Sequence, residues 1–166
     1  MAYVSQENKK EIIAEVKKVL PKGWKATFKV QNSSTLICTI KEMPKSDLIS
    51  MAYDSKIESC EYARNYVLRR GVPSKFNEFL ESMIWKDKAE KMTELSESIM
   101  IFSGNSEGSF ENINFLNKKY SSVIFNLIKA LNFKNYNHSD SMTDYFCVGY
   151  YIDLNFGYYD KPCKLV

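Results

Sequence analysis

Hydrophobic and polar positions follow two different periods in the first 43 residues. Behind Ser5, a suitable N-cap, apolar residues recur at the three- and four-residue spacings of an amphipathic helix, namely Ile12, Ile13, Val16, Val19 and Leu20. Residues 26–30 and 35–40 then alternate between apolar and polar side chains, on either side of Asn32-Ser33-Ser34. This pattern predicts a helix followed by a β-hairpin, whose short polar turn permits a bulge or a three-residue connection.

The middle of the chain changes to a helical period. Residues 56–70 bring Tyr62, Tyr66 and Arg70 to one side of a helix, which Gly71 and the following proline end. From Ser74 a second apolar stripe follows, formed by Phe76, Phe79, Leu80, Met83 and Ile84 and continuing towards Leu95, Ile99 and Phe102. We therefore predict a helical hairpin, inserted over residues 54–102, and a loop over residues 103–112.

The pattern of apolar residues in the last third of the chain predicts one buried helix and one strand. The helix has an apolar stripe made of Phe115, Leu116, Tyr120, Val123, Ile124, Leu127, Ile128 and Leu131. The strand spans residues 145–155 and is rich in aromatic and β-branched residues. Its alternation assigns to the core face Phe146, Val148, Tyr150, Ile152 and Leu154. Gly157 and Pro162 are expected to end the regular structure.

The order of these elements is typical of an α+β domain. We expect a small antiparallel or mixed sheet, made of the hairpin and the C-terminal strand and packed by helices on one face. A chain of 166 residues is the size of one ordinary domain. We therefore predict a single domain over residues 1–166, in which residues 1–43 and 113–166 form the α+β scaffold and residues 54–102 form the helical insert.

Composition and charge exclude several classes of protein. A formal charge of +3 is small for a nucleic-acid-binding domain. The excess lies in the first helix and hairpin, in Lys9, Lys10, Lys17, Lys18, Lys22, Lys25 and Lys29, where a solvated face is favoured over a phosphate-binding patch. The four cysteines are far apart, and no signal-peptide pattern or membrane-length apolar run is present. We expect a cytoplasmic protein with reduced thiols, no metal or other cofactor and no membrane partner.

Residues 135–146 gather the chain's only histidine with carboxylate and hydroxyl side chains. His138, Asp140 and Asp144 include the residue types of a general base with an orienting carboxylate, or of a metal site. Their spacing matches no hydrolase or metalloenzyme motif, and no second histidine is available. The favoured interpretation is a structural motif of His138, Ser139, Asp140, Thr143 and Asp144 that closes a turn before the strand, because such side chains bond to nearby backbone.

Tyrosine and arginine residues supply the candidate partner-binding positions. The predicted insert contains Tyr62, Arg64, Tyr66, Arg69 and Arg70, a combination typical of interaction hot spots, although Arg69 and Arg70 equally suit a helix C-terminus. In the C-terminal segment, Tyr151, Tyr158 and Tyr159 are the expected surface aromatics. Without a basic surround, a protein interface is favoured over base stacking for these three residues.

Two motifs carry a resemblance to a known family. They are Tyr-Val-Ser-Gln-Glu-x-Lys-Lys at residues 3–10, and Asn-x-Ser-Asp-x-x-Thr-Asp-Tyr-Phe-x-Val-Gly-x-Tyr at residues 137–151 with the later Gly-x-Tyr-x-Lys-Pro at 157–162. The chain resembles small α+β proteins of phages and mobile elements related to a large-polyvalent-protein-associated domain. The resemblance covers roughly residues 1–43 and 115–162 and omits the insert.

The resemblance implies a setting for the function but no catalytic residues. Relatives of that kind are associated with mobile elements entering a host, beside counter-defence functions. With no enzyme motif in the chain, we expect a non-enzymatic counter-defence protein that blocks a host protein or ribonucleoprotein, such as a CRISPR or restriction nuclease, by covering its surface. The alternatives are a nucleic-acid-binding accessory protein and a small hydrolase using His138 and Asp140.

Overall fold

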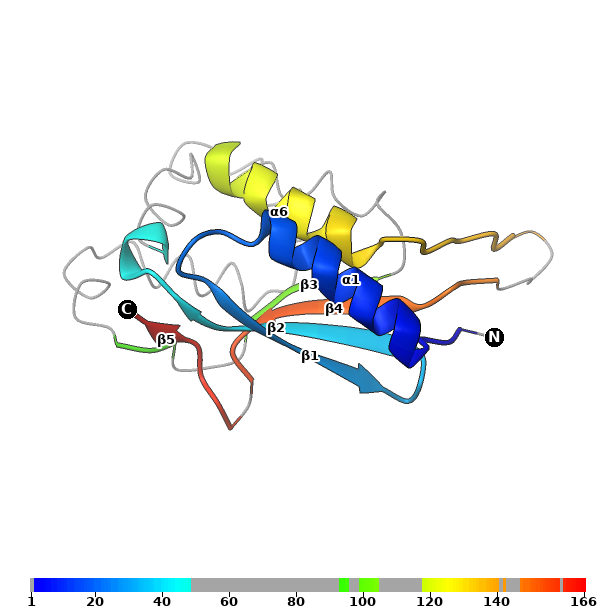
Figure 1. Cartoon of the computed structure of the whole chain (residues 1–166), viewed down its shortest axis with the longest axis horizontal. Helices are drawn as coiled ribbons and strands as arrows, with labels where there is room; N and C mark the ends of the chain where they lie inside the picture. Colours follow the sequence, from blue (N-terminus) through cyan, green and yellow to red (C-terminus); the bar gives the residue numbers. More distant parts are fainter. Residues whose placement is uncertain are drawn as a thin grey trace.

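The fold is a layer of helices on one face of a mixed sheet (Figure 1). The computed structural model describes residues 2–48, 93–95, 99–104, 118–140, 142, 147–158 and 160–166. Within these residues, helices α1 (Gln6–Val19) and α6 (Lys118–Leu131) pack against each other and cover one face of a five-stranded sheet. The predicted α+β class with a small sheet is confirmed, and the sheet is mixed.

Strand β2 lies inside the sheet and has neighbours on both sides. The strands are β1 (Lys25–Gln31), β2 (Thr35–Met43), β3 (Ile99–Gly104), β4 (Tyr151–Phe156) and β5 (Lys164–Leu165). Their order is β1-β2-β4-β3, with β2 antiparallel to β1 and parallel to β4, and β4 antiparallel to β3. β5 runs parallel to the end of β2. Both segments that follow α6 therefore align along β2.

The first helix and the hairpin form as their residues predict. The Ser5 hydroxyl accepts a hydrogen bond from the Asn8 backbone N–H at 3.0 Å and caps α1. Three residues connect β1 to β2, and Asn32 and Ser33 adopt positive φ angles of 52° and 58°. Small polar residues tolerate this left-handed backbone better than branched apolar ones do, so the turn has the predicted three-residue connection.

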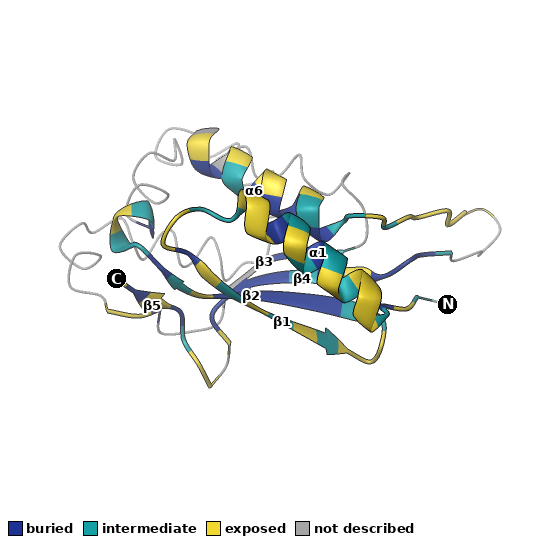
Figure 2. Ribbon diagram, in the orientation of Figure 1, coloured by how far each residue is buried: buried dark blue, intermediate teal, exposed yellow. Residues whose placement is uncertain are grey.

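Alternate residues of the two inner strands form the core with the helices. The side chains that face α1 and α6 are fully buried in β2 at Leu36, Cys38 and Ile40, and in β4 at Ile152, Leu154 and Phe156. α1 contributes Ile12 and Val16, and α6 contributes Ile124, Leu127, Ile128 and Leu131. Figure 2 shows β2 and β4 as the most continuously buried strands. The predicted core face is confirmed from residue 148 to residue 154, while Phe146 lies outside the described residues.

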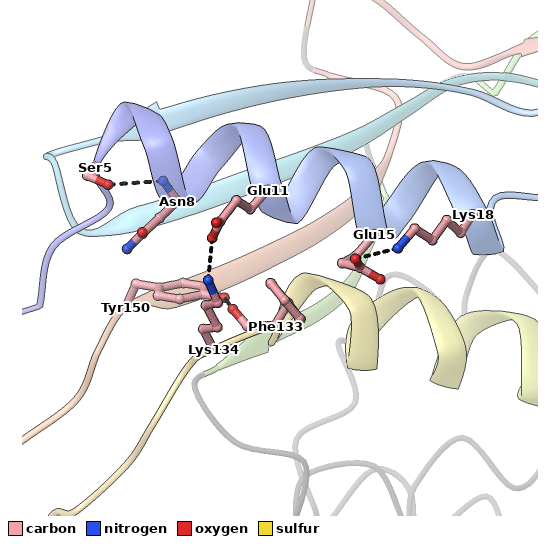
Figure 3. A network of polar contacts seen from close by, with 8 residues as sticks. All are labelled: Ser5, Asn8, Glu11, Glu15, Lys18, Phe133, Lys134 and Tyr150. Carbon is pink, nitrogen blue, oxygen red and sulfur yellow. Dashed lines mark hydrogen bonds and ion pairs between the residues drawn. The ribbon is translucent and has the colours of Figure 1, made fainter.

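Polar contacts join the helices and hold the end of α6 (Figure 3). Lys134 pairs with Glu11 of α1 at 2.8 Å, but this ion pair is exposed and contributes little. The Tyr150 hydroxyl is buried and lies 2.7 Å and 2.8 Å from the carbonyl oxygens of Leu131 and Phe133, to which it donates. Burial raises the pKa of Tyr150 above its usual value, so the phenol stays a donor to these helix-end carbonyls.

The predicted second helix is wrong at its C-terminal end. Residues 99–104 form strand β3, which pairs with β4, and Leu95 is buried in the core rather than part of that helix. Leu95, Ile99 and Phe102 have helical spacing, but residues 99–102 are also an uninterrupted apolar run, which a short buried strand produces equally well. The insert assigned to residues 54–102 therefore ends in a strand of the sheet.

The C-terminal strand is also shorter than predicted, and the regular structure continues beyond it. β4 begins at Tyr151, while Val148 forms only an isolated bridge with Asn137. After Gly157 the chain leaves the sheet in a turn and rejoins β2 as β5, in the same direction as β4, so Pro162 does not end the regular structure. Gly157 has a φ of 72°, and a Cβ there would lie 2.8 Å from the Cys163 backbone nitrogen. The turn thus requires a residue without a side chain.

Several predicted positions lie outside the described residues. They include most of the proposed insert, with five of its candidate partner-binding residues, and three positions of the C-terminal segment. These positions are Tyr62, Arg64, Tyr66, Arg69, Arg70, Thr143, Asp144 and Tyr159.

A carboxylate links the hairpin to the start of α6. Asp47 accepts a hydrogen bond from the Trp24 indole N–H and another from the Tyr120 hydroxyl, each at 2.8 Å. Both donors belong to residues buried in the core, and the Trp24 ring packs edge-on against Phe156. Burial, followed by the hydrogen bond and charge of Asp47, raises the pKa of Tyr120. Asp47 therefore satisfies two core donors with one side chain.

We predict that Asp47→Ala lowers the free energy of unfolding by about 2–4 kcal/mol, because it leaves two buried donors without an acceptor. Tyr120→Phe removes one hydrogen bond and should cost about 1–2 kcal/mol. Urea denaturation of the purified variants measures both effects. Asp160→Ala, a change at an exposed carboxylate, is the control and should cost less than about 0.5 kcal/mol. Equal effects of Asp47→Ala and Asp160→Ala would contradict this role of Asp47.

Candidate functional site: a lysine-lined pocket on the outer face

The sheet face turned away from α1 and α6, here called the outer face, carries the alternate residues of the strands. On β2 these residues are Ile37, Thr39 and Lys41, and on β4 they are Tyr151, Asp153 and Asn155. Unlike the core face, this face mixes charged, hydroxyl, amide and aromatic groups. It is therefore the part of the sheet with the chemistry for recognising a partner.

A pocket of about 830 Å³ lies on the outer face. Its floor comes from β1 and β2, through Thr27, Ile37 and Thr39. Its walls come from the segment after β4 and from the short stretch at residue 94, which bridges to Lys164 of β5. The backbone groups of Tyr158 and Lys161 bond to each other at 2.9 Å and 3.0 Å, so a tight turn fixes this wall. A volume of this size is typical of ligand-binding pockets.

The pocket lining has an excess of positive charge. It includes the ammonium groups of Lys29, Lys41, Lys161 and Lys164, and the carboxylates of Glu42, Glu94 and Asp160. Glu42 already forms an ion pair with Lys25. Within the part of the chain that the structure describes, the other six groups form no ion pair. Four unpaired ammonium groups against two unpaired carboxylates favour an anionic ligand.

Two of the predicted surface tyrosines lie on this side of the sheet. Tyr158 lines the pocket and is 42% exposed, and the Lys29 ammonium lies 6.0 Å from the centre of its ring. Tyr151 is 40% exposed and belongs to the outer row of β4, opposite Thr35 of β2. The structure thus places an exposed ring at the pocket and another further along the same face.

One buried polar group lies beside the pocket floor. Asn155 is 8% exposed, and its side-chain oxygen has no hydrogen-bond partner in the part of the chain that the structure describes. It pairs across β2 and β4 with Thr39, which lines the pocket. A buried acceptor left without a donor costs about 1–3 kcal/mol, so this position is unusual in a folded core.

The lysines of the first helix and hairpin do not form one surface. Lys10, Lys17 and Lys18 are exposed on α1, in the helical layer, whereas Lys29 reaches the pocket on the outer face. The basic excess seen in the sequence is therefore divided between opposite layers. A continuous phosphate-binding stripe would need these charges on one side.

The residues around His138 form local bonds in an arm that extends beyond the sheet (Figure 1). The Asn137 side chain accepts from the Ser139 backbone N–H, and the Asp140 side chain accepts from the Met142 N–H, as in turns closed by such residues. The Ser139 hydroxyl accepts from the Cys147 N–H. His138 is exposed and stacks on Tyr136 at 5.4 Å between ring centres, and neither Asp140 nor Ser139 is bonded to its ring.

Asn135 connects the arm to β4. Its side-chain oxygen accepts from the Tyr150 backbone N–H at 3.0 Å, and its side-chain nitrogen donates to the Tyr150 carbonyl at 3.0 Å. The same amide also bonds to Asn132 and to the Tyr136 N–H. One side chain thus takes the place of a strand partner for Tyr150. The hydrophobic periodicity of the sequence does not indicate this role, because an Asn after a helix is typical of a turn.

We predict that Asn135→Ala lowers the free energy of unfolding by about 2–3 kcal/mol, because it leaves the backbone of Tyr150 without its partners. His138→Ala and Met142→Ala, at exposed positions of the same arm, should each cost less than about 0.5 kcal/mol. Chemical denaturation of the three variants compares them. A large loss of stability in His138→Ala would contradict the local role assigned to this residue.

The described residues offer little for metal or thiol chemistry. They contain no group of three or more His, Cys, Asp or Glu residues that could hold a metal ion. Burial raises the pKa of the Cys38 thiol to about 12, and burial together with the Glu42 charge raises that of Cys163 to about 12. Both thiols remain protonated near neutral pH and are poor nucleophiles.

Sequence reasoning missed the pocket because its lysines come from distant segments. Lys29 and Lys41 belong to the hairpin, while Lys161 and Lys164 lie more than a hundred residues later. Only the parallel pairing of β5 with β2 brings them together. The only sign of the pocket in the sequence is the alternation along β2, which places Thr39 and Lys41 on the face of the strand that points away from the core.

Comparisons with protein-family models, with curated proteins and with solved structures found no match to this chain. The resemblance to phage and mobile-element proteins therefore remains an expectation. None of the helices that the structure describes is long and apolar enough to cross a membrane.

Proposed function

We propose that this chain is a non-catalytic binding protein, whose protein partner docks on the outer face of the sheet. The observation that carries the proposal is the pocket on that face, with an exposed tyrosine in its wall and with lysines and carboxylates that form no ion pair with any described residue. Interfaces combine aromatic anchors with charged groups at their rim. The second exposed tyrosine, Tyr151, extends this surface along β4.

The resemblance to phage and mobile-element proteins supports a particular class of partner. In that setting the partner is a host defence protein or ribonucleoprotein, such as a CRISPR or restriction nuclease, and the chain blocks it by covering a surface. Occlusion of this kind needs complementary shape and charge but no reactive side chain. The proposal of a non-catalytic role is supported by the exposed His138 ring, which stacks on Tyr136, and by the buried, protonated thiols of Cys38 and Cys163.

The second candidate, a nucleic-acid-binding accessory protein, is favoured by the net positive charge of the pocket. Against it, the basic residues of α1 lie in the other layer and carboxylates line the same pocket as the lysines. Binding to nucleic acid by phosphate contacts would weaken steeply with added salt, because condensed counterions are released.

We predict that the purified protein inhibits at least one nuclease from a panel of restriction and CRISPR enzymes of matched hosts. Replacing Tyr151 and Tyr158 together by Ala should weaken that inhibition by at least about tenfold, since buried tyrosines are common interface hot spots. Titration of the inhibitor into a DNA-cleavage assay measures the effect.

The matched control for this experiment is Phe125→Ala. Phe125 is 41% exposed, as the two tyrosines are, but lies on α6 in the helical layer. Its replacement should leave inhibition unchanged. If no nuclease is inhibited or bound, the counter-defence proposal fails. If Phe125→Ala weakens inhibition as much as the tyrosine changes do, the docking surface is not the outer face.

A further inference from the structure

We infer that the lysine-lined pocket binds an acidic polypeptide segment of the partner, a stretch of chain that carries several carboxylates. This inference rests on the proposed function for its partner and adds the chemistry that the partner must present. Such a site requires a concave surface and an excess of positive charge. The pocket has both, because its ammonium groups outnumber its carboxylates and form no ion pair within the described part of the chain.

The arrangement of the lysines suits separate carboxylates rather than one compact anion. Lys29 and Lys41 belong to the adjacent strands β1 and β2, whereas Lys161 precedes β5 and Lys164 belongs to it, on the other side of β2 from β1. An ammonium group is a point charge on a flexible stem, and each can pair with a different carboxylate. Acidic side chains spaced along an extended segment would meet these ammonium groups one after another.

The carboxylates of the lining distinguish a peptide from a polyphosphate. Glu94 and Asp160 are unpaired among the described residues and line the same pocket as the lysines. A nucleic-acid backbone has phosphates at every step and would place some of them near these carboxylates, at an electrostatic cost. A polypeptide also has backbone N–H donors, which can face a carboxylate.

The side-chain oxygen of Asn155 is buried next to the same floor, although Asn155 does not itself line the pocket. It lies one strand away from Thr39 and lacks a donor in the described part of the chain. The phosphate diesters of a nucleic-acid backbone have only acceptors at neutral pH, whereas a peptide backbone has both donors and acceptors. The unpaired carboxylates that line the pocket, among the described residues, therefore find donors in a peptide and none in a phosphate backbone.

The test uses the full-length protein and a fluorescein-labelled hexaglutamate peptide, with anisotropy as the readout at low and at moderate salt. The pocket variant carries Lys41→Glu and Lys161→Glu. The control variant carries Lys10→Glu and Lys17→Glu on α1, which change the net charge by the same amount in the other layer. An oligothymidylate of equal charge is the second probe, and unlabelled inorganic phosphate is the competitor.

We expect the pocket variant to bind hexaglutamate at least about tenfold more weakly than the parent, and the control variant to lose less than about threefold, because the attraction acts within a Debye length. Circular dichroism and thermal unfolding check that each variant folds. If the pocket variant does not fold, Lys41→Met with Lys161→Met removes the two charges without introducing repulsion, and should still weaken binding.

Three results of the binding assay would overturn the inference. In the first, the pocket and control variants lose the same amount of affinity for the peptide. In the second, the parent binds the oligothymidylate more tightly than the peptide, and the pocket variant loses that binding. In the third, inorganic phosphate fully displaces the peptide at matched ionic strength. Nuclease inhibition that persists without peptide binding would reject this inference alone. A parent protein that neither binds the peptide nor inhibits or binds any nuclease would reject the proposed function as well.

Discussion

The rest of the structure depends on the pairing of β2 with strands on both of its sides. β2 is antiparallel to β1 and parallel to β4 and β5, so its backbone has to pair with three neighbouring strands in one register. Because side chains alternate along a strand, a shift by one residue would exchange its two faces and carry Lys41 into the core. The buried row of Leu36, Cys38 and Ile40 fixes the register, and this in turn fixes what the outer face presents.

The same constraint links the fold to the proposed site. Once the apolar row of β2 is directed to the helices, Thr39 and Lys41 are directed outward with no further choice. The segment after β4 then turns at Gly157 and rejoins β2 further along as β5, which brings Lys161 and Lys164 to the same pocket as the hairpin lysines. The pocket is thus a consequence of strand pairing at the end of β2. The core below it is closed by α1 and α6, so binding on the outer face needs no opening of the core.

Local signals predicted the parts of the fold that depend on neighbours in sequence. Ser5, the stripe of α1, the polar turn of the hairpin and the core face around Tyr150 all follow from caps and periodicity. β3 was missed because Ile99 and Phe102 fit a helix and a strand equally well. β5 has two residues, too few for a period, and the links made by Asp47 and Asn135 are long-range contacts of single side chains. The candidate site was missed for the same reason, since its lysines meet only after the sheet has formed.

The most direct test of the central claim is a map of the binding surface, obtained by titrating isotope-labelled protein with hexaglutamate and following backbone amide resonances by NMR. The account predicts that the largest shifts occur at Thr27, Thr39 and Lys41, on the pocket side of β1 and β2, with small shifts at Lys10 and Lys17 of α1. The largest shifts on α1, or shifts spread evenly over both layers, would contradict it.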